Sequence, residues 1–447
     1  MKVARKSLDS YLERFNRLDD AASDSPAWLS RLRRDAMLRF AETGFPTIAD
    51  EDWRYTNVAS LAATSYETAP APSPDGHCRT ESLAAGGNGG VRCVFLNGRY
   101  CAELSRVDEK ESRVRVDSLA SILRERPEEV EAHLARYVEA DRHPFVTLNT
   151  AFIEDGAVVR VSGGTRIPDP IHLVFLSTGN GGPAFVTHPR NLILVGAGSE
   201  CSVVEHYLGV GEKSYFSNPV TEVSVGENAN LDHYRLQEES PAAHHVSTLE
   251  IRQESNSVAR TMSADLGGRL TRNDLNVFLG GEGADAALDG IFVVSGEQLV
   301  DNHTRIEHAA PHCGSREIYK GILGDRSRGV FRGRIVVHPG AQKTDSVQTN
   351  NNLLLSDRAL VNTKPQLEIY ADEVKCTHGA TIGQLDQEAI FYMRSRGIDE
   401  DMARSILTYG FAEDVIRRVR PAGLRDRLSS LLFDRLPQGG FLRKALT

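Results

Sequence analysis

The chain has 447 residues and a formal net charge of −9 at pH 7. This length allows a large buried core, arranged as two or three domains or as one elongated unit. The mildly acidic balance argues against nucleic acid as the main partner. No apolar run is long enough to span a bilayer and no apolar signal core opens the sequence, so we expect a cytoplasmic protein whose six scattered cysteines are free thiols.

Residues 1–68 are expected to form an N-terminal helical region. Apolar residues recur at helical spacing over about 7–45, where a Gly-Phe-Pro sequence is expected to end the helix. The segment 50–56, Asp-Glu-Asp-Trp-Arg-Tyr-Thr, follows. Its composition predicts that Trp53 and Tyr55 anchor a loop on the domain surface.

Residues 69–144 are expected to hold a linker, a β-hairpin and a further helix. The stretch 69–90 is rich in Pro, Ala, Ser and Gly, which is typical of a flexible linker or a long loop. Two apolar runs then flank an Asn-Gly pair, which predicts a hairpin with a two-residue turn. This register places the thiols of Cys93 and Cys101 on opposite sides, so we expect no disulfide between them. Helical spacing returns over 117–141.

Residues 145–384 are expected to form a β-rich core. Short β-type runs alternate with Gly, Asn, Asp and Ser turns, and similar units recur roughly every 27 to 30 residues. Such units cannot bury their apolar faces alone, so stacking into a β-solenoid is the natural solution. Sandwiches and barrels also contain many short strands, and the periodicity alone leaves them open.

Residues 385–447 return to a helical pattern. Asp386 and Asp399 can cap two helices, and Gly397 can end the first of them. A third amphipathic helix follows Pro421. These helices can cover the open end of the β-rich core, but three of them exceed what a cap needs. Docking of a partner protein is therefore the second interpretation of this region.

A thiol and an imidazole lie two residues apart in the stretch 373–383, Glu-Val-Lys-Cys-Thr-His-Gly-Ala-Thr-Ile-Gly. In a strand, Cys376 and His378 would project from one face. Both ligand types suit iron, zinc or an iron-sulfur cluster. Two ligands cannot close a four-coordinate site, and no second Cys-x-His or Cys-x-x-Cys sequence exists in the chain, so a partner would supply the others. The alternative is a packed cysteine beside a hydrogen-bonded histidine.

Two other patterns carry less chemistry. The sequence Gly-Val-Gly-Glu-Lys-Ser at 209–214 has Glu212 where a phosphate loop needs a glycine directly before the lysine, so we expect no nucleotide to bind this chain. A second group of possible metal ligands comprises His303, His308, His312 and Cys313. Their spacing does not place three of them on one strand face, which favours hydrogen-bonded histidines over a metal site.

Several stretches of the C-terminal half resemble the SufB/SufD family, whose members are subunits of the SUF iron-sulfur cluster assembly complex. They are the sequences at 333–342, 348–355, 364–370, the Cys-x-His stretch and 391–397. The sequence Glu-Asp-Trp-Arg-Tyr-Thr at 51–56 resembles the SufD members rather than the SufB members. The resemblance implies a mainly β fold, with a right-handed parallel β-helix (β-solenoid) core flanked by N-terminal and C-terminal α-helical regions.

The resemblance also implies a function as a non-catalytic scaffold or accessory subunit. Such a subunit would pair with SufB through the solenoid edge and share a site for iron or a transient iron-sulfur cluster, with His378 and Cys376 at the interface. The C-terminal helices would dock the SufC ATPase, and we take Arg394, Arg396 and Tyr409 as candidates for that surface. The isolated chain could also form a homodimer through the same edge.

Two alternatives remain open from the sequence. The first is a stand-alone β-helix enzyme that acts on acidic polysaccharide, against which the net negative charge and the helical C-terminus count. The second is the SufB paralogue itself, which the aromatic sequence at 51–56 disfavours.

Overall fold

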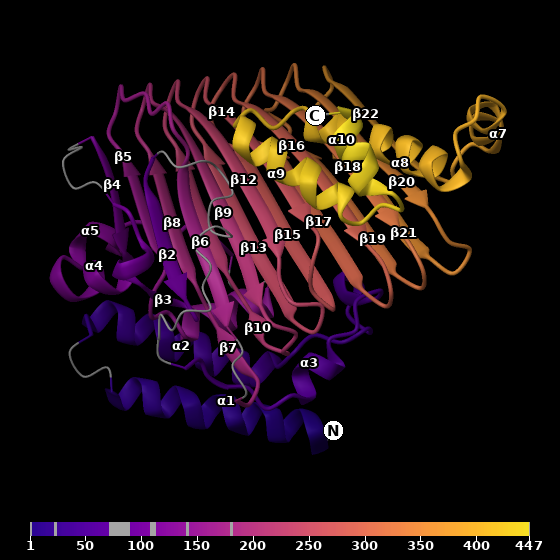
Figure 1. Ribbon diagram of the computed structural model, residues 1–447. Coiled ribbons are helices and arrows are strands. Elements are labelled where there is room, and N and C mark those ends of the chain that lie inside the picture. The colour runs from indigo at the N-terminus through magenta and orange to yellow at the C-terminus, as the bar shows by residue number, and fades with distance from the viewer. Residues whose placement is uncertain are drawn as a thin grey trace.

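Two long β-sheets wound from alternating strands dominate the fold (Figure 1). The computed structural model describes residues 2–21, 25–70, 90–107, 113–139, 143–178 and 182–446. Most of the expected linker at 69–90 therefore lies outside the described residues, as does Cys78. The chain passes from one sheet to the other and back at each turn, and successive strands of the same sheet pair in parallel, which confirms the predicted β-solenoid.

The two sheets differ in which strands they collect. The first, called sheet A here, contains β4 (Val114–Ser118), β5 (Ala157–Val161), β8 (Arg190–Val195), β11 (Val220–Val225), β13 (His244–Gln253), β15 (Leu270–Leu279), β17 (Leu299–His308), β19 (Arg328–Val337) and β21 (Leu360–Ile369), with β1 (Glu67–Thr68), β7 (Phe185–Thr187) and β10 (Phe216–Ser217) beside this path. The second, sheet B, contains β3 (Arg99–Tyr100), β2 (Arg92–Leu96), β6 (Ile171–Thr178), β9 (Glu200–Val210), β12 (Asn230–Glu238), β14 (Val258–Asp265), β16 (Asp285–Val294), β18 (Gly314–Leu323), β20 (Asp345–Leu354) and β22 (Lys375–Gly383).

A stacked turn explains the Gly and Asn signals of the repeats. At the passage from sheet A to sheet B, Asn228, Asn256 and His312 have φ values of 57°, 55° and 59°. The left-handed region is most accessible to glycine and asparagine, which is why these residues recur at this place. The backbone N–H of each turn donates to a carbonyl of the next turn, as from Asn228 to Ser255 at 2.9 Å. The turns therefore form a hydrogen-bonded ladder of their own.

Side chains alternate between the interior and the outer faces, as expected for strands. On β9, Cys201 and Val203 belong to the core between the two sheets. Val204, which follows Val203 and points to the opposite face, packs against the C-terminal helices. Each sheet therefore needs a cover on its outer face, and the helices supply it.

The N-terminal helices cover sheet A. They are α1 (Lys2–Ala21), α2 (Ala27–Thr43), the 3-10 turn η1 (Glu51–Trp53), α3 (Ala59–Ala63), α4 (Leu119–Glu125), α5 (Glu128–Glu131) and α6 (Pro144–Ala151). Phe40 and Phe145 pack with Val246 and Leu270 of sheet A. Gly44 ends α2 with a φ of 66°, as predicted. Helix α6 stands where the sequence predicted the first β runs, because its apolar side chains are buried on nearly every side.

The expected hairpin is present. Strands β2 and β3 pair antiparallel around the Asn-Gly turn, and the 3-10 turn η3 (Ala102–Leu104) follows. Cys93 lies in the core between the sheets, whereas Cys101 packs in a separate cluster with Val94 and Leu176. The two thiols face different sides, and both are free.

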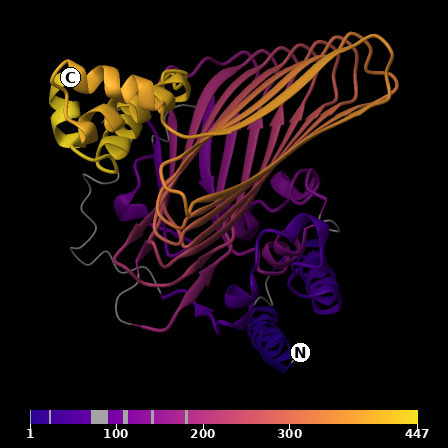
Figure 2. The same ribbon diagram turned by 90° about the vertical axis from the view of Figure 1, so that its right-hand side faces the viewer.

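The C-terminal helices cover the outer face of sheet B. They are α7 (Gln387–Ser395), α8 (Glu400–Ile416), α9 (Ala422–Phe433) and α10 (Gly439–Leu446). Asp386 and Asp399 cap α7 and α8 through their side chains, as predicted. Tyr234, Met262 and Ile291 of sheet B pack against α8, α9 and α10. The expectation that these helices cap the open end of the solenoid is wrong, because they bury this lateral face and leave the last strands uncovered (Figure 2). No described helix is long and apolar enough to cross a membrane.

Candidate functional site

The open end of the solenoid is formed by the last strand of each sheet. Strand β22 pairs with β20 on one side, and its other edge is free within the described part of the chain. The N–H of Lys375 donates to Thr344 at 2.8 Å, so the alternate N–H groups from Cys376 to Ile382 point to the free edge. An edge of this kind presents unpaired backbone donors and acceptors to another chain.

The structure places Cys376 and His378 on β22, two residues apart and on the same face. Cys376 packs against the core between the sheets and is half-buried, whereas His378 is exposed. Burial raises the pKa of the Cys376 thiol, and a hydrogen bond with the backbone of Ser346 opposes this rise in part. A thiolate at this place would need further stabilisation, such as a bound metal ion or a donor from another subunit.

The described residues contain no group of three or more His, Cys, Asp or Glu side chains that could hold a metal ion. His308 is buried with its Nε2 3.0 Å from Ser315 Oγ, and His312 sits in the stacked turn. Cys313 donates to the carbonyl of Gly281 at 3.3 Å. His303 lies elsewhere, in a network of ion pairs. The structure therefore does not bring these four side chains together.

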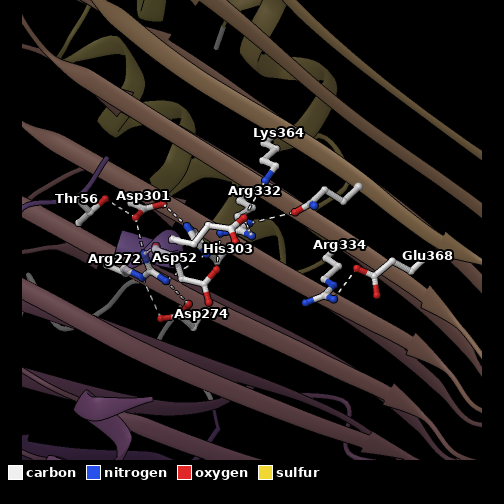
Figure 3. Close-up of polar contacts among 12 residues, drawn as sticks. Asp52, Thr56, Arg272, Asp274, Asp301, His303, Arg332, Arg334, Lys364 and Glu368 are labelled. Atoms are coloured by element: carbon white, nitrogen blue, oxygen red, sulfur yellow. Dashed lines mark hydrogen bonds and ion pairs between the residues drawn. The ribbon is translucent and has the colours of Figure 1, made fainter. Parts of the chain in front are cut away.

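That network joins the N-terminal segment 50–56 to the outer face of sheet A (Figure 3). Arg272 of β15 is buried and donates to both oxygens of Asp274, at 2.8 and 3.1 Å. It also donates to Asp301 at 2.8 Å and to the backbone carbonyl of Asp52 at 2.6 Å. Burial raises the pKa of Asp301, but the charges of His303 and Arg272 outweigh this effect and hold that pKa at about 2.

The same segment reaches the edge strand of sheet A. Asp52 forms an ion pair with Arg332 of β19, and Glu51 bridges Arg332 and Lys364 at 2.9 and 3.0 Å. Lys364 belongs to β21, the last strand of sheet A. The N-terminal segment is thus tied to the open end by side chains that are more than two hundred residues away in sequence. Arg272 and Asp301 were not predicted from the sequence, in which only the alternation of charged residues on neighbouring repeats indicates them.

The C-terminal candidates lie in two different settings. Arg394 pairs with Glu400 at 3.2 Å, and Arg396 stacks 4.5 Å from the ring centroid of Tyr392. Both belong to the region of α7, which projects from the body of the protein (Figure 1). Tyr409 instead stacks on Phe433 inside the helical layer, with ring centroids 4.7 Å apart.

Two family models match most of the chain. The model of the SufBD protein N-terminal region matches residues 5–173, and the model of the SufBD core domain of the SUF system for FeS cluster assembly matches residues 175–411. The chain belongs to the SufBD family of iron-sulfur cluster assembly proteins. The resemblance inferred from the sequence is therefore confirmed.

Curated relatives match most of the chain. A SufBD family protein of Synechocystis is 31% identical, with 96% of this chain and 95% of the relative covered. The iron-sulfur cluster assembly protein SufD of Escherichia coli is 33% identical over 89% of this chain and 90% of that protein. SufD of Bacillus subtilis is 25% identical over 91% and 94%. Two of these three relatives are SufD proteins, and family membership favours cluster assembly over the polysaccharide-acting alternative.

Proposed function

We propose that this chain is a non-catalytic scaffold subunit that pairs with a SufB-type paralogue and holds part of an iron-sulfur cluster assembly site at their interface. The observation that carries the proposal is the free edge of β22, the strand on which Cys376 and His378 project from the same face. Nearly every side chain of β22 is exposed in the isolated chain, so the strand presents its side chains as well as its unpaired backbone edge to a partner.

The edge of sheet B is the better suited of the two for pairing. Directly after β21, the backbone N–H of Tyr370 donates to the carbonyl of Val337, so the backbone nitrogen of Pro365, at an odd-numbered position, faces the free side of that strand. Proline has no N–H to donate there, and it is tolerated in strands at such edges. Strand β22 contains no proline and keeps all its outward N–H groups. We therefore place the shared interface along β22.

The chemistry of the pair suits a transient site. Iron and iron-sulfur clusters bind thiolate and imidazole ligands, and this chain would supply at most one of each. The remaining ligands would come from the paralogue, so the cluster would be held only while the two chains are paired. In this account the cluster is cargo, and the chain contributes ligands and geometry instead of a catalysed reaction.

The C-terminal region is the proposed docking site for an ATPase subunit of the SufC type. Helix α7 packs on α8 through Ile390 and projects from the body of the protein (Figure 1), and its Phe391 and Tyr392 are 74% and 58% exposed. Arg394 and Arg396 add positive charge to the same helix end. Aromatic residues and arginines of this kind are enriched in protein interfaces. Tyr409 would act indirectly, by fixing α8 against α9. Binding and hydrolysis of ATP would belong to the partner, and the assembly would work in the cytoplasm.

Co-expression with the SufB-type and SufC-type proteins of the same organism tests this function. The complex is isolated anaerobically and loaded with iron and sulfide, and wild type is compared with His378→Ala and Cys376→Ser. We expect a stable complex whose cluster content falls in the variants. Failure to form a complex would remove the scaffold role, and normal loading without either side chain would remove the proposed site. Elution of the isolated chain as a dimer, and of Ala380→Pro as a monomer, would show that the same edge also pairs with itself.

A further inference from the structure

The interior directly beneath Cys376 and His378 is polar and ordered. Strand β20 is the register neighbour of β22, with Ser346 opposite Cys376 and Gln348 opposite His378. In-register neighbours in a parallel sheet point to the same face about 4.8 Å apart. Both β20 side chains are completely buried, which is unusual for serine and glutamine unless they are hydrogen-bonded.

The serine belongs to a chain of hydrogen bonds. Ser346 Oγ lies 2.7 Å from Ser315 Oγ, which lies 3.0 Å from Nε2 of His308. Burial lowers the pKa of His308 to about 4, so its imidazole is neutral near pH 7. A neutral imidazole can donate through Nε2, and the two hydroxyls then donate in sequence toward β22. The last hydroxyl in this series is that of Ser346, beneath the sulfur of Cys376.

The glutamine is held from two sides. Its Nε2 donates to Oε2 of Glu317 at 2.6 Å. From sheet A, Gly333 leaves the space that the amide fills, because a Cβ at that glycine would lie 2.2 Å from Gln348 Nε2. Within the described residues, Oε1 of Gln348 is buried and takes no hydrogen bond. A buried acceptor without a partner destabilises the folded protein, so we expect a donor for this oxygen from a neighbouring side chain. The register neighbour of Gln348 on β22 is His378.

We propose that Ser346 and Gln348 are positioning residues for Cys376 and His378, with the Ser346 hydroxyl donating to the cysteine sulfur and Gln348 Oε1 accepting from one ring N–H of the histidine. The other ring nitrogen of His378 is thereby left free to bind iron. Metal-binding histidines almost always give their second N–H to a carboxylate, a backbone carbonyl or a water, which fixes the tautomer, and the amide oxygen of glutamine can accept in the same way. This inference rests on the function proposed above.

The neighbouring position on β20 provides a matched control. Asn350 is also completely buried and donates to the carbonyl of Tyr319 at 3.2 Å. Its register neighbour on β22 is Ala380, which has no ligand atom. Asn350→Ala therefore removes a buried amide from the same strand and face without touching either candidate ligand. A purely structural polar ladder would make all three β20 positions equivalent.

The serine is tested by the rate at which iodoacetamide alkylates Cys376 in the full-length chain near pH 7. Cys78→Ala is present in every variant, and the other described cysteines are buried. Loss of a hydrogen bond to the thiolate in Ser346→Ala is expected to slow alkylation about tenfold. Ser346→Thr, which keeps the hydroxyl, and Asn350→Ala should react like wild type. Equal rates in Ser346→Ala and wild type would overturn the assignment of Ser346.

The glutamine is tested by the ¹⁵N chemical shifts of the His378 ring in histidine-labelled protein, identified by their loss in His378→Ala. Wild type should show one dominant tautomer. Gln348→Met, which has similar length and no hydrogen bond, should give a mixture, as should Glu317→Met. Glu317→Gln keeps an acceptor for the amide and should restore the wild-type spectrum. An unchanged spectrum in Gln348→Met would overturn the assignment of Gln348.

Cluster loading of the complex separates this inference from the proposed function. Normal loading of His378→Ala would mean that the site itself is wrong. If His378→Ala loses its cluster while Ser346→Ala and Gln348→Met load like Asn350→Ala, the site stands and the positioning role fails. Loss of loading in both positioning variants, with normal loading in Asn350→Ala, is the expected result.

Discussion

The guanidinium carbon of Arg272 lies 3.9 Å from the centroid of the Trp53 ring. This contact joins an N-terminal segment to the outer face of sheet A across more than two hundred residues of sequence. Arg272 is held at the same time by Asp274 and Asp301, so the tryptophan covers a buried cluster of charges. Trp53 therefore has a structural role in this fold, because its ring covers the buried charged cluster.

Replacement of Trp53 should destabilise the protein strongly. Trp53 is 6% exposed, and Trp53→Ala would open a cavity and admit water to Arg272, at a cost of about 3 to 5 kcal/mol in the free energy of unfolding. Tyr55, two residues away, is 49% exposed, and Tyr55→Ala should change that free energy by less than about 0.5 kcal/mol. Urea unfolding followed by circular dichroism measures both. Similar decreases in the free energy of unfolding of the two variants would contradict the role of Trp53 as the cover of the buried charges.

A buried carboxyl on sheet A should make stability depend on pH. Burial raises the pKa of Glu250 to about 8 from its ordinary value of 4.5, although Arg252 opposes the rise. Between these pH values the folded state keeps a proton that the unfolded state has lost, so stability falls as pH increases. Glu250→Gln should remove this loss and be more stable than wild type at pH 8 by more than about 1 kcal/mol.

Thermal unfolding at pH 5 and pH 8 measures this effect. Glu254 lies on the exposed turn after the same strand, and Glu254→Gln should keep the wild-type dependence on pH. If the stability difference between wild type and Glu250→Gln is the same at pH 5 and pH 8, Glu250 is ionised in the folded state at both pH values and the prediction is wrong.

The free edge of β22 offers a direct test of pairing. The N–H of Ala380 points away from β20, so Ala380→Pro removes no hydrogen bond within the chain while it blocks a partner strand. We expect at least about tenfold weaker association with the SufB-type paralogue, measured by titration calorimetry. Ala380→Val keeps the N–H and should bind normally. Unchanged binding by the proline variant would place the interface elsewhere.

The exposed face of α7 should matter for the ATPase subunit and not for folding. Phe391→Asp places a charge on a side chain that is 74% exposed, so the unfolding midpoint should stay close to that of wild type. Binding to the SufC-type protein should weaken at least about tenfold, as for other aromatic interface residues. Leu38→Asp alters an apolar side chain of α2 that is 66% exposed and serves as the control. Equal binding of both variants would remove α7 from the docking surface.

Local signals in the sequence were sufficient for much of the fold. The repeats, the hairpin around Asn-Gly, the caps at Asp386 and Asp399 and the end of α2 at Gly44 all depend on neighbouring residues, and all are confirmed. Helix α6 was missed because its apolar residues are buried on several sides, which removes the helical periodicity that marks a half-exposed helix.

The sequence by itself determined that the chain is a repeating β structure between helical ends, with a thiol and an imidazole on one strand face. Periodicity and turn chemistry are local properties, so they can be read along the chain. Only the tertiary structure decided that β22 is a free edge, that the C-terminal helices cover a lateral face, and that Ser346 and Gln348 lie beneath Cys376 and His378. These relations arise from stacking turns about thirty residues apart, and strand register across turns is set by packing of the whole solenoid.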